Sequence, residues 1–60
     1  MYYVIIINNR EETKTTKDYK TLRNAEKAYN KACEDNDNYV QLFEYASGYE
    51  IFDKLIKTNF

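Results

Sequence analysis

The chain of 60 residues carries a formal net charge of −1 and contains one cysteine and no histidine. A chain of this length forms one small domain, so we expect residues 1–60 to fold as a single unit. Domains this small usually gain stability from disulfides, a metal or a partner chain. Cys33 alone cannot form an intramolecular disulfide, and without histidine a thiolate or imidazole zinc site has too few ligands. Self-association is therefore the favoured source of stability, and we expect a homodimer.

The sequence also indicates a compartment and an origin. The apolar run at residues 2–7 is far shorter than the ~20 residues of a membrane span, and it lacks the preceding basic segment of a secretory signal. A lone thiol suits a reducing compartment, so we expect a cytoplasmic protein. Half of the residues are Phe, Tyr, Met, Ile, Asn or Lys, whose codons are rich in A and T. This composition fits many bacteria and their phages.

Residues 2–7 are aromatic or aliphatic throughout and end at a turn-prone Asn8-Asn9, which predicts a β-strand. Side chains alternate between the two faces of a strand, so both of its faces are apolar. The two sets are Tyr2, Val4 and Ile6 on one face and Tyr3, Ile5 and Ile7 on the other. The pattern leaves open which set meets the rest of the core.

A hairpin and a helix are predicted next. Residues 8–10 suit a tight turn, since Asn tolerates the left-handed conformation, and the polar segment 11–19 then forms an exposed edge strand. Thr21 is a suitable N-cap for a helix over residues 22–34, which ends in the Asp/Asn loop 35–38. The side of the helix that faces the core is formed by Leu22, Ala25, Ala28, Tyr29, Ala32 and Cys33.

We predict a further strand at residues 39–46, and two alternative structures, a strand or a helix, for residues 48–57. A turn at Ser47-Gly48 would make it the second strand of a hairpin, whereas a capping box at residues 47–50 would begin a helix. The hairpin pairs Phe43 with Phe52, Tyr39 with Ile56, Val40 with Leu55 and Gln41 with Lys54. We therefore predict an α+β fold of order β-β-α-β-β, a small antiparallel sheet with one helix on one face. The alternative is β-β-α-β-α with a C-terminal helix.

The alanine-rich helix needs large residues opposite, and we expect Tyr39, Phe43, Phe52 and Ile56 to supply them. The other face of the sheet would then lie uncovered, and exposed apolar patches often mark interaction surfaces. The predicted protein-binding residues on that face are Val40, Leu42, Glu44, Ile51, Asp53 and Leu55.

Catalytic and cofactor patterns are missing. The chain has no histidine for general base catalysis, its only serine lies in the Ser47-Gly48 turn, and its one glycine excludes a glycine-rich phosphate loop. Cys33 falls on the buried side of the helix and is interpreted as a core residue. Residues 35–38 begin like a calcium-binding loop, but Val40 stands where such a loop requires glycine. We predict no enzymatic activity, no metal and no cofactor.

The charge is distributed unevenly. Residues 10–31 hold seven basic and four acidic side chains, whereas residues 32–53 hold six acidic ones and no basic one. Such asymmetry favours an oriented partner. A basic column on the helix is the basis of the alternative function, nucleic-acid binding, and consists of Lys20, Arg23, Lys27 and Lys31.

Seven tyrosines support a different function, because tyrosine joins a large apolar area to a polar tip and is enriched at protein interfaces. We predict a non-enzymatic protein-binding module that forms a homodimer and also binds a host protein. A short protein of this composition fits an accessory protein of a phage or mobile element that inhibits a bacterial factor, such as an antiviral defence.

Overall fold

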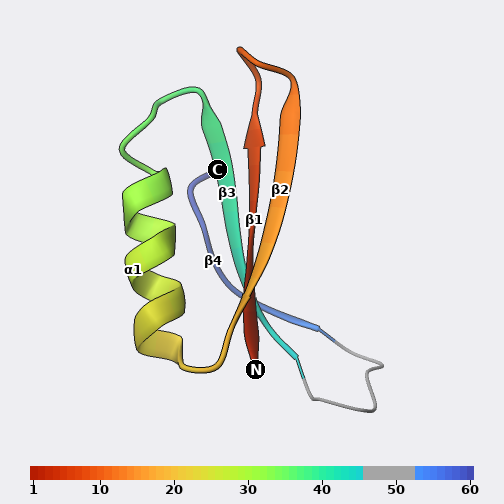
Figure 1. The fold of residues 1–60 in the computed structure, drawn as a ribbon, viewed down its shortest axis with the longest axis vertical. Helices are drawn as coiled ribbons and strands as arrows, with labels where there is room; N and C mark the ends of the chain where they lie inside the picture. Colours follow the sequence, from red (N-terminus) through yellow and green to blue (C-terminus); the bar gives the residue numbers. More distant parts are fainter. Residues whose placement is uncertain (46–52) are drawn as a thin grey trace.

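The computed structural model describes residues 1–45 and 53–60 and contains a four-stranded antiparallel sheet with one helix. The elements are β1 (Tyr2–Asn8), β2 (Thr13–Tyr19), α1 (Leu22–Ala32), β3 (Asn38–Glu44) and β4 (Lys54–Thr58). The strand order is β2-β1-β3-β4, so β1 and β3 are central and β2 is an edge strand (Figure 1). The predicted β-β-α-β-β order is confirmed.

The segment after β3 decides between the two predicted C-terminal structures. Lys54–Thr58 is a strand that pairs with β3, so the helical alternative is wrong for these residues. The Ser47-Gly48 turn and the capping box at residues 47–50 lie outside the described residues.

The connection between β1 and β2 differs from the predicted tight turn at residues 8–10. Asn8 stays within β1 opposite Thr13, so the loop is formed by residues 9–12. The residue with a positive φ is Glu12, at 58°, and not an asparagine. Asn8 is retained in the strand because its side chain, only 8% exposed, has partners there: its Oδ1 accepts from the Glu11 amide at 2.8 Å, and its Nδ2 donates to Asn38 Oδ1 at 2.7 Å.

Helix α1 begins as predicted and ends two residues earlier than predicted. The Thr21 hydroxyl accepts a hydrogen bond from the Asn24 amide at 3.2 Å, which confirms its role as N-cap. After Cys33 at the C-cap, Asp35 Oδ1 accepts from the Asp37 amide at 2.9 Å. This local bond competes with helical hydrogen bonding, as predicted for the Asp/Asn loop.

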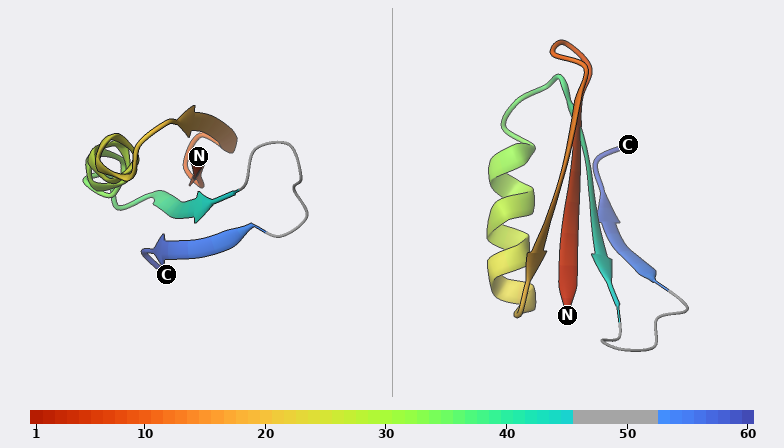
Figure 2. Two further views of the ribbon diagram at one scale, coloured as in Figure 1. Left: turned by 90° about the horizontal axis from the view of Figure 1, so that it is seen from below. Right: turned by 45° about the vertical axis from the view of Figure 1, so that its right-hand side comes forward.

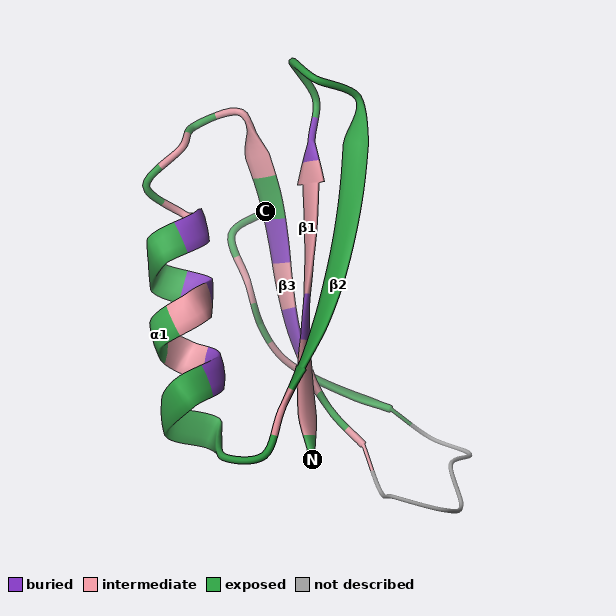
Figure 3. Ribbon diagram, viewed as in Figure 1, coloured by how far each residue is buried: buried purple, intermediate pink, exposed green. Residues whose placement is uncertain are grey.

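One face of the sheet holds the core (Figures 2 and 3). Helix α1 lies over that face, and no described helix or strand lies over the other. The buried residues are Val4, Ala25, Tyr29, Ala32, Val40 and Leu42, with Tyr2, Ile6, Tyr19, Ala28, Cys33 and Ile56 packed against them. The choice left open for β1 is therefore settled: Tyr2, Val4 and Ile6 face the helix.

The prediction of which side chains of β3 face the helix is wrong. Val40 and Leu42 were expected on the uncovered face, but both are 0% exposed and lie beneath α1. Tyr39, expected in the core, is 44% exposed, and Phe43 shares its face. The physical reason is that α1 carries its own large core residue, Tyr29, so compact aliphatic residues fit beneath the alanines. Ile56 packs on the core as predicted, whereas Phe52 lies outside the described residues.

The register of the β3–β4 hairpin also differs from the prediction. The structure pairs Gln41 with Thr58, Leu42 with Lys57, Phe43 with Leu55 and Glu44 with Lys54. A register shift lies between Leu42 and Phe43, because Ile56 is an extra residue in β4. Beyond the strand, Asn59 continues the contact through its side chain, accepting from the Val40 amide and donating to the Asn38 carbonyl, each at 2.9 Å. The last described pair of the hairpin is Glu44 with Lys54, so residues 45–53 separate β3 from β4.

Candidate functional site: the open face of the sheet

The side of the sheet away from α1 is the candidate site, and we call it the open face. Its members follow from the strand registers and the alternation of side chains. They form three rows across the strands: an upper row of Lys14, Ile7 and Tyr39; a middle row of Thr16, Ile5, Gln41 and Thr58; and a lower row of Asp18, Tyr3, Phe43 and Leu55. Apolar and aromatic side chains dominate the two outer rows.

An aromatic cluster occupies the lower end of the open face. The Tyr3 ring stacks on Phe43 with centroids 5.0 Å apart and an interplanar angle of 15°, and it lies 5.5 Å from the Tyr45 ring. The Tyr3 hydroxyl donates to Asp53 Oδ2 at 2.7 Å. Burial, together with this hydrogen bond and the negative charge of Asp53, raises the pKa of Tyr3 to about 12. Tyr3 is therefore a neutral donor throughout the physiological range.

A shallow hollow of 310 Å³ lies beside this cluster. It is lined by Tyr3, Thr16, Asp18, Tyr45 and Asp53. Two carboxylates beside aromatic rings form a surface that suits a cationic side chain, which gains both charge pairing and contact with the rings. The hollow is open to solvent, so it fits a protruding side chain better than an enclosed small molecule.

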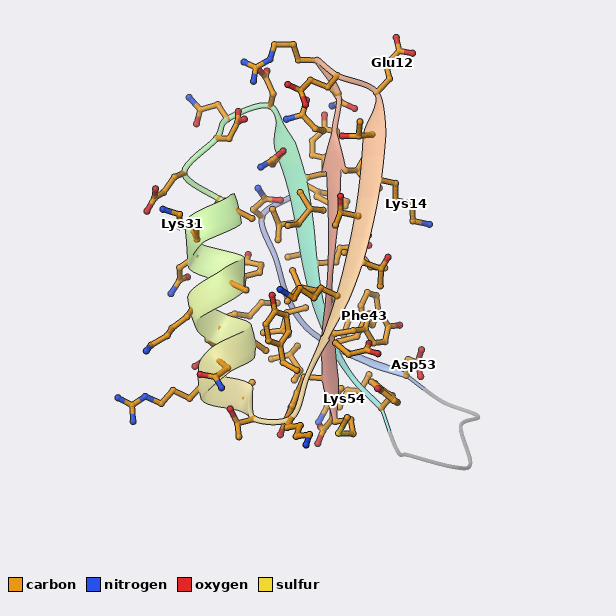
Figure 4. The ribbon with its side chains drawn as sticks, viewed as in Figure 1. Glu12, Lys14, Lys31, Phe43, Asp53 and Lys54 are labelled. Atoms are coloured by element: carbon orange, nitrogen blue, oxygen red, sulfur yellow. The ribbon has the colours of Figure 1, made fainter. Side chains whose placement is uncertain are left out.

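The charges of the open face are separated along the strands. Lys14 lies at the upper end of β2, while Asp18 and Asp53 lie at the lower end. Figure 4 shows Lys14 and Asp53 on the side away from α1, at different heights of the sheet. Within the described part of the chain, Lys14 and Asp18 form no ion pair. The open face thus has a positive end and a negative end, separated by a mostly polar middle row.

The predicted protein-binding residues divide into four groups. Leu55, 46% exposed, and Asp53 lie on the open face as expected. Val40 and Leu42 are buried core residues, and Glu44 is exposed on the helix side of β3, opposite Tyr2. Ile51 lies outside the described residues. The face itself was predicted correctly in kind, as an apolar surface left uncovered by the helix.

The predicted binding residues did not include the aromatic members of the face or the charged residues Lys14 and Asp18. A signal for them was present in β3, where Gln41 alternates with Tyr39 and Phe43 on the same face. A polar amide and a phenol on one face indicate the solvent side, whereas Val40 and Leu42 have no polar group to satisfy. Lys14 lies in the edge strand predicted at residues 11–19, and only the register places it on the open face.

The basic column of the alternative function is located on the helix side of the molecule. Lys20, Arg23, Lys27 and Lys31 are all exposed, and none forms an ion pair with a described residue. Lys31 points away from the sheet in Figure 4. The column and the open face therefore lie on opposite sides of the protein.

The remaining chemistry-bearing residues have structural partners. Cys33 is half-buried against the core. The Arg10 guanidinium lies 3.4 Å from an Asp35 carboxylate oxygen and 3.0 Å from one of Asp37. Among residues 1–45 and 53–60, no three acidic or cysteine side chains gather as they would around a metal ion. The described helix is also too short and too polar to cross a membrane.

Comparisons with protein-family models, with curated proteins and with solved structures gave no match to this chain. The candidate function therefore depends on the geometry of the open face.

Proposed function

We propose that this chain is a non-enzymatic protein-binding module and that the open face of its sheet is the binding surface. One observation carries the proposal: Tyr39 and Leu55 are 44% and 46% exposed on a face that also presents Ile5, Ile7 and Phe43. Contiguous exposed apolar surface of this kind is typical of protein interaction sites. Its two outer rows contain the aromatic residues Tyr3, Tyr39 and Phe43, and aromatic residues are enriched in interface cores.

The arrangement suits a protein better than other ligands. A sheet face without a helix over it offers a broad contact area, and the hollow beside Tyr3 can receive one lysine or arginine side chain of a partner. Tyrosine side chains supply much of the contact area with little loss of conformational freedom. We further propose that the partner is a bacterial factor inhibited by this protein, an extension that rests on the A/T-rich composition.

The proposal is tested with a double substitution on the open face, Tyr39→Glu with Leu55→Glu. Both side chains are largely exposed, so the domain is expected to stay folded, as checked by circular dichroism. A partner isolated with the wild-type chain from extracts of its source organism is then purified and titrated by calorimetry. We expect the double variant to bind at least about tenfold more weakly, because charges replace exposed apolar side chains in both outer rows of the face.

The matched control is Lys27→Glu with Lys31→Glu on the helix, which also changes exposed residues and also adds negative charge. This variant is expected to bind the partner as the wild type does. Retention of the partner by the open-face variant contradicts the proposal.

Nucleic-acid binding is the second candidate, favoured by the exposed basic column, whose members form no ion pair with a described residue. It predicts the opposite pattern: loss of binding in the helix variant, and an affinity for oligonucleotides that falls steeply with salt.

A further inference from the structure

We propose that the open face binds a second copy of this chain, with the two sheets face to face and their strands antiparallel. This inference rests on the proposed function, since it takes the open face as the interface and names its partner. The two-fold axis lies between the sheets and runs across the strands along the middle row, above Thr16, Ile5 and Gln41.

The open face is complementary to itself under this rotation. Rotation about this axis places the upper row of one copy opposite the lower row of the other. The middle row of one copy faces the middle row of the other. Ile7 then meets the partner's Tyr3, and Tyr39 meets the partner's Phe43. An aliphatic or aromatic side chain therefore faces an aromatic one at each of these positions. Contacts that repeat reciprocally in this way are the property of an isologous interface.

The charges select the antiparallel arrangement. Rotation about the proposed axis places Lys14 opposite the partner's Asp18, at the rim of the hollow that Asp53 also lines. The symmetry makes this contact twice. A two-fold axis along the strands, between β1 and β3, would instead place β2 opposite the partner's β4, so that Asp18 would face the partner's Leu55. A carboxylate covered by an apolar side chain loses its hydration without gaining an opposite charge, so the charges favour the antiparallel arrangement.

The size of the face predicts a weak dimer. With strands about 4.8 Å apart and about 3.3 Å of rise per residue, the open face measures roughly 20 Å by 20 Å. Two such faces bury on the order of 800 Å² in total, which is below the standard size of a stable complex. We therefore expect a dissociation constant between about 10 μM and about 1 mM. Sheets packed in this way align within about 30°, which the two-fold axis permits.

The test is a pair of single charge reversals, Lys14→Asp and Asp18→Lys, studied by sedimentation equilibrium from about 5 μM to about 1 mM. Each reversal brings like charges together at both symmetric contacts, so each variant alone is expected to self-associate about tenfold more weakly than the wild type. An equimolar mixture of the two variants restores opposite charges at both contacts. We expect the mixture to associate as strongly as the wild type, and the double variant Lys14→Asp with Asp18→Lys to do the same.

The control is Lys17→Asp, which makes the same charge change on the same strand but on the helix side, opposite Val4. It is expected to leave self-association unchanged. Loss of the effect of both reversals at high salt, where exposed ion pairs are screened, would further support direct contact.

The outcomes separate this inference from the proposed function. A wild-type chain that stays monomeric throughout the concentration range, or a dimer that ignores both reversals, overturns the proposed arrangement while the open face can still bind another protein. A dimer weakened equally by Lys17→Asp overturns it as well, because net charge then explains the effect. If Tyr39→Glu with Leu55→Glu also leaves the dimer intact, the open face is not the dimer interface; the proposed function fails only if this variant also retains the isolated partner.

Discussion

Individual polar residues determine how the ends of the elements meet. The Asn8 side-chain Nδ2 donates to Asn38 Oδ1 at 2.7 Å, and Nδ2 of the Asn38 side chain in turn donates to the Ala32 carbonyl at 2.8 Å. One short chain of hydrogen bonds thus joins the end of β1, the start of β3 and the end of α1. At the opposite end of the sheet, the bond between Tyr3 and Asp53 joins β1 to the residue before β4.

The environment of Tyr3, including its bond to Asp53, predicts how the free energy of unfolding depends on pH. The pKa of Tyr3 is raised to about 12, so the folded state favours the protonated phenol. The resulting stability is fully present below about pH 10, where the unfolded tyrosine is also protonated. It is lost as the pH rises from about 10 through 12, because the unfolded chain ionises first.

The measurement is the pH titration of the Tyr3 ring carbons by NMR in the wild type and in Asp53→Asn. Burial is the largest cause of the shift, and the hydrogen bond and charge of Asp53 come second. We therefore expect the midpoint in the variant to fall below the wild-type value of about 12 but to stay above the ordinary value of 10.0. An unchanged midpoint would show that Asp53 has no part in the shift.

At the scale of elements, the packing of α1 determines which face of each strand is buried. Its alanines allow a close approach to the sheet, while Tyr29 fills the space that remains. The Tyr29 ring also lies 5.4 Å from the Lys57 ammonium, and Lys57 forms an ion pair with Glu26 at 3.6 Å. The helix therefore reaches β4 through polar and aromatic contacts and covers β1 and β3 through apolar ones.

Because Val40 faces the helix and Tyr39 faces solvent, we expect substitutions at these neighbouring residues of β3 to change the free energy of unfolding by different amounts. Val40→Ala leaves a cavity beneath α1, so we expect the free energy of unfolding to fall by about 2 kcal/mol. Tyr39→Ala removes an exposed ring that packs edge-on against the Phe60 ring, with centroids 5.0 Å apart. We expect this substitution to lower the free energy of unfolding by less than about 1 kcal/mol.

Urea unfolding of both variants at low protein concentration, where the chain is monomeric, measures these costs. The face predicted from the sequence requires the opposite order, so a larger loss for Tyr39→Ala would contradict the structure.

On the scale of the whole molecule, one thin core supports the fold. Six described residues are buried apolar ones, and they lie between one helix and one face of the sheet. The other face exposes apolar surface to water, which contributes nothing to the stability of the monomer. Covering that face is therefore a way for a chain of 60 residues to gain stability.

A dimer formed through the open face makes stability depend on concentration. For a dissociation constant near 100 μM, raising the protein from about 10 μM to about 1 mM adds roughly 1 kcal/mol to the free energy of unfolding. In a domain of this size we expect the melting temperature to rise by about 4–8 °C. Scanning calorimetry at both concentrations checks this, and Lys14→Asp should reduce the rise. A melting temperature independent of concentration would argue against association.

Under the two proposals, self-association and capture of another protein compete for the same face. A weak dimer covers the apolar surface when the protein is abundant, and dissociation on dilution exposes it. A partner that binds more tightly than the second copy then displaces that copy, so the two proposals describe one surface with two occupants.

The sequence by itself determined the elements and their order. Local signals acted within a few residues of one another: the apolar run of β1, the Thr21 cap, the periodicity of α1 and the Asp/Asn loop. These features depend on backbone propensity and local hydrogen bonds, which a sequence pattern displays directly. The existence of an uncovered apolar face also followed, because one helix can cover only one side of a sheet.

Only the tertiary structure decided which residues form that face. A shift of one residue exchanges the two faces of a strand, and both faces of β1 are apolar, so its pattern could not choose. Burial of Tyr29 and the extra residue Ile56 in β4 depend on contacts between distant segments. The registers of β1, β2 and β3 then place Lys14 and Asp18 at opposite ends of the open face, and this placement carries the proposed two-fold interface.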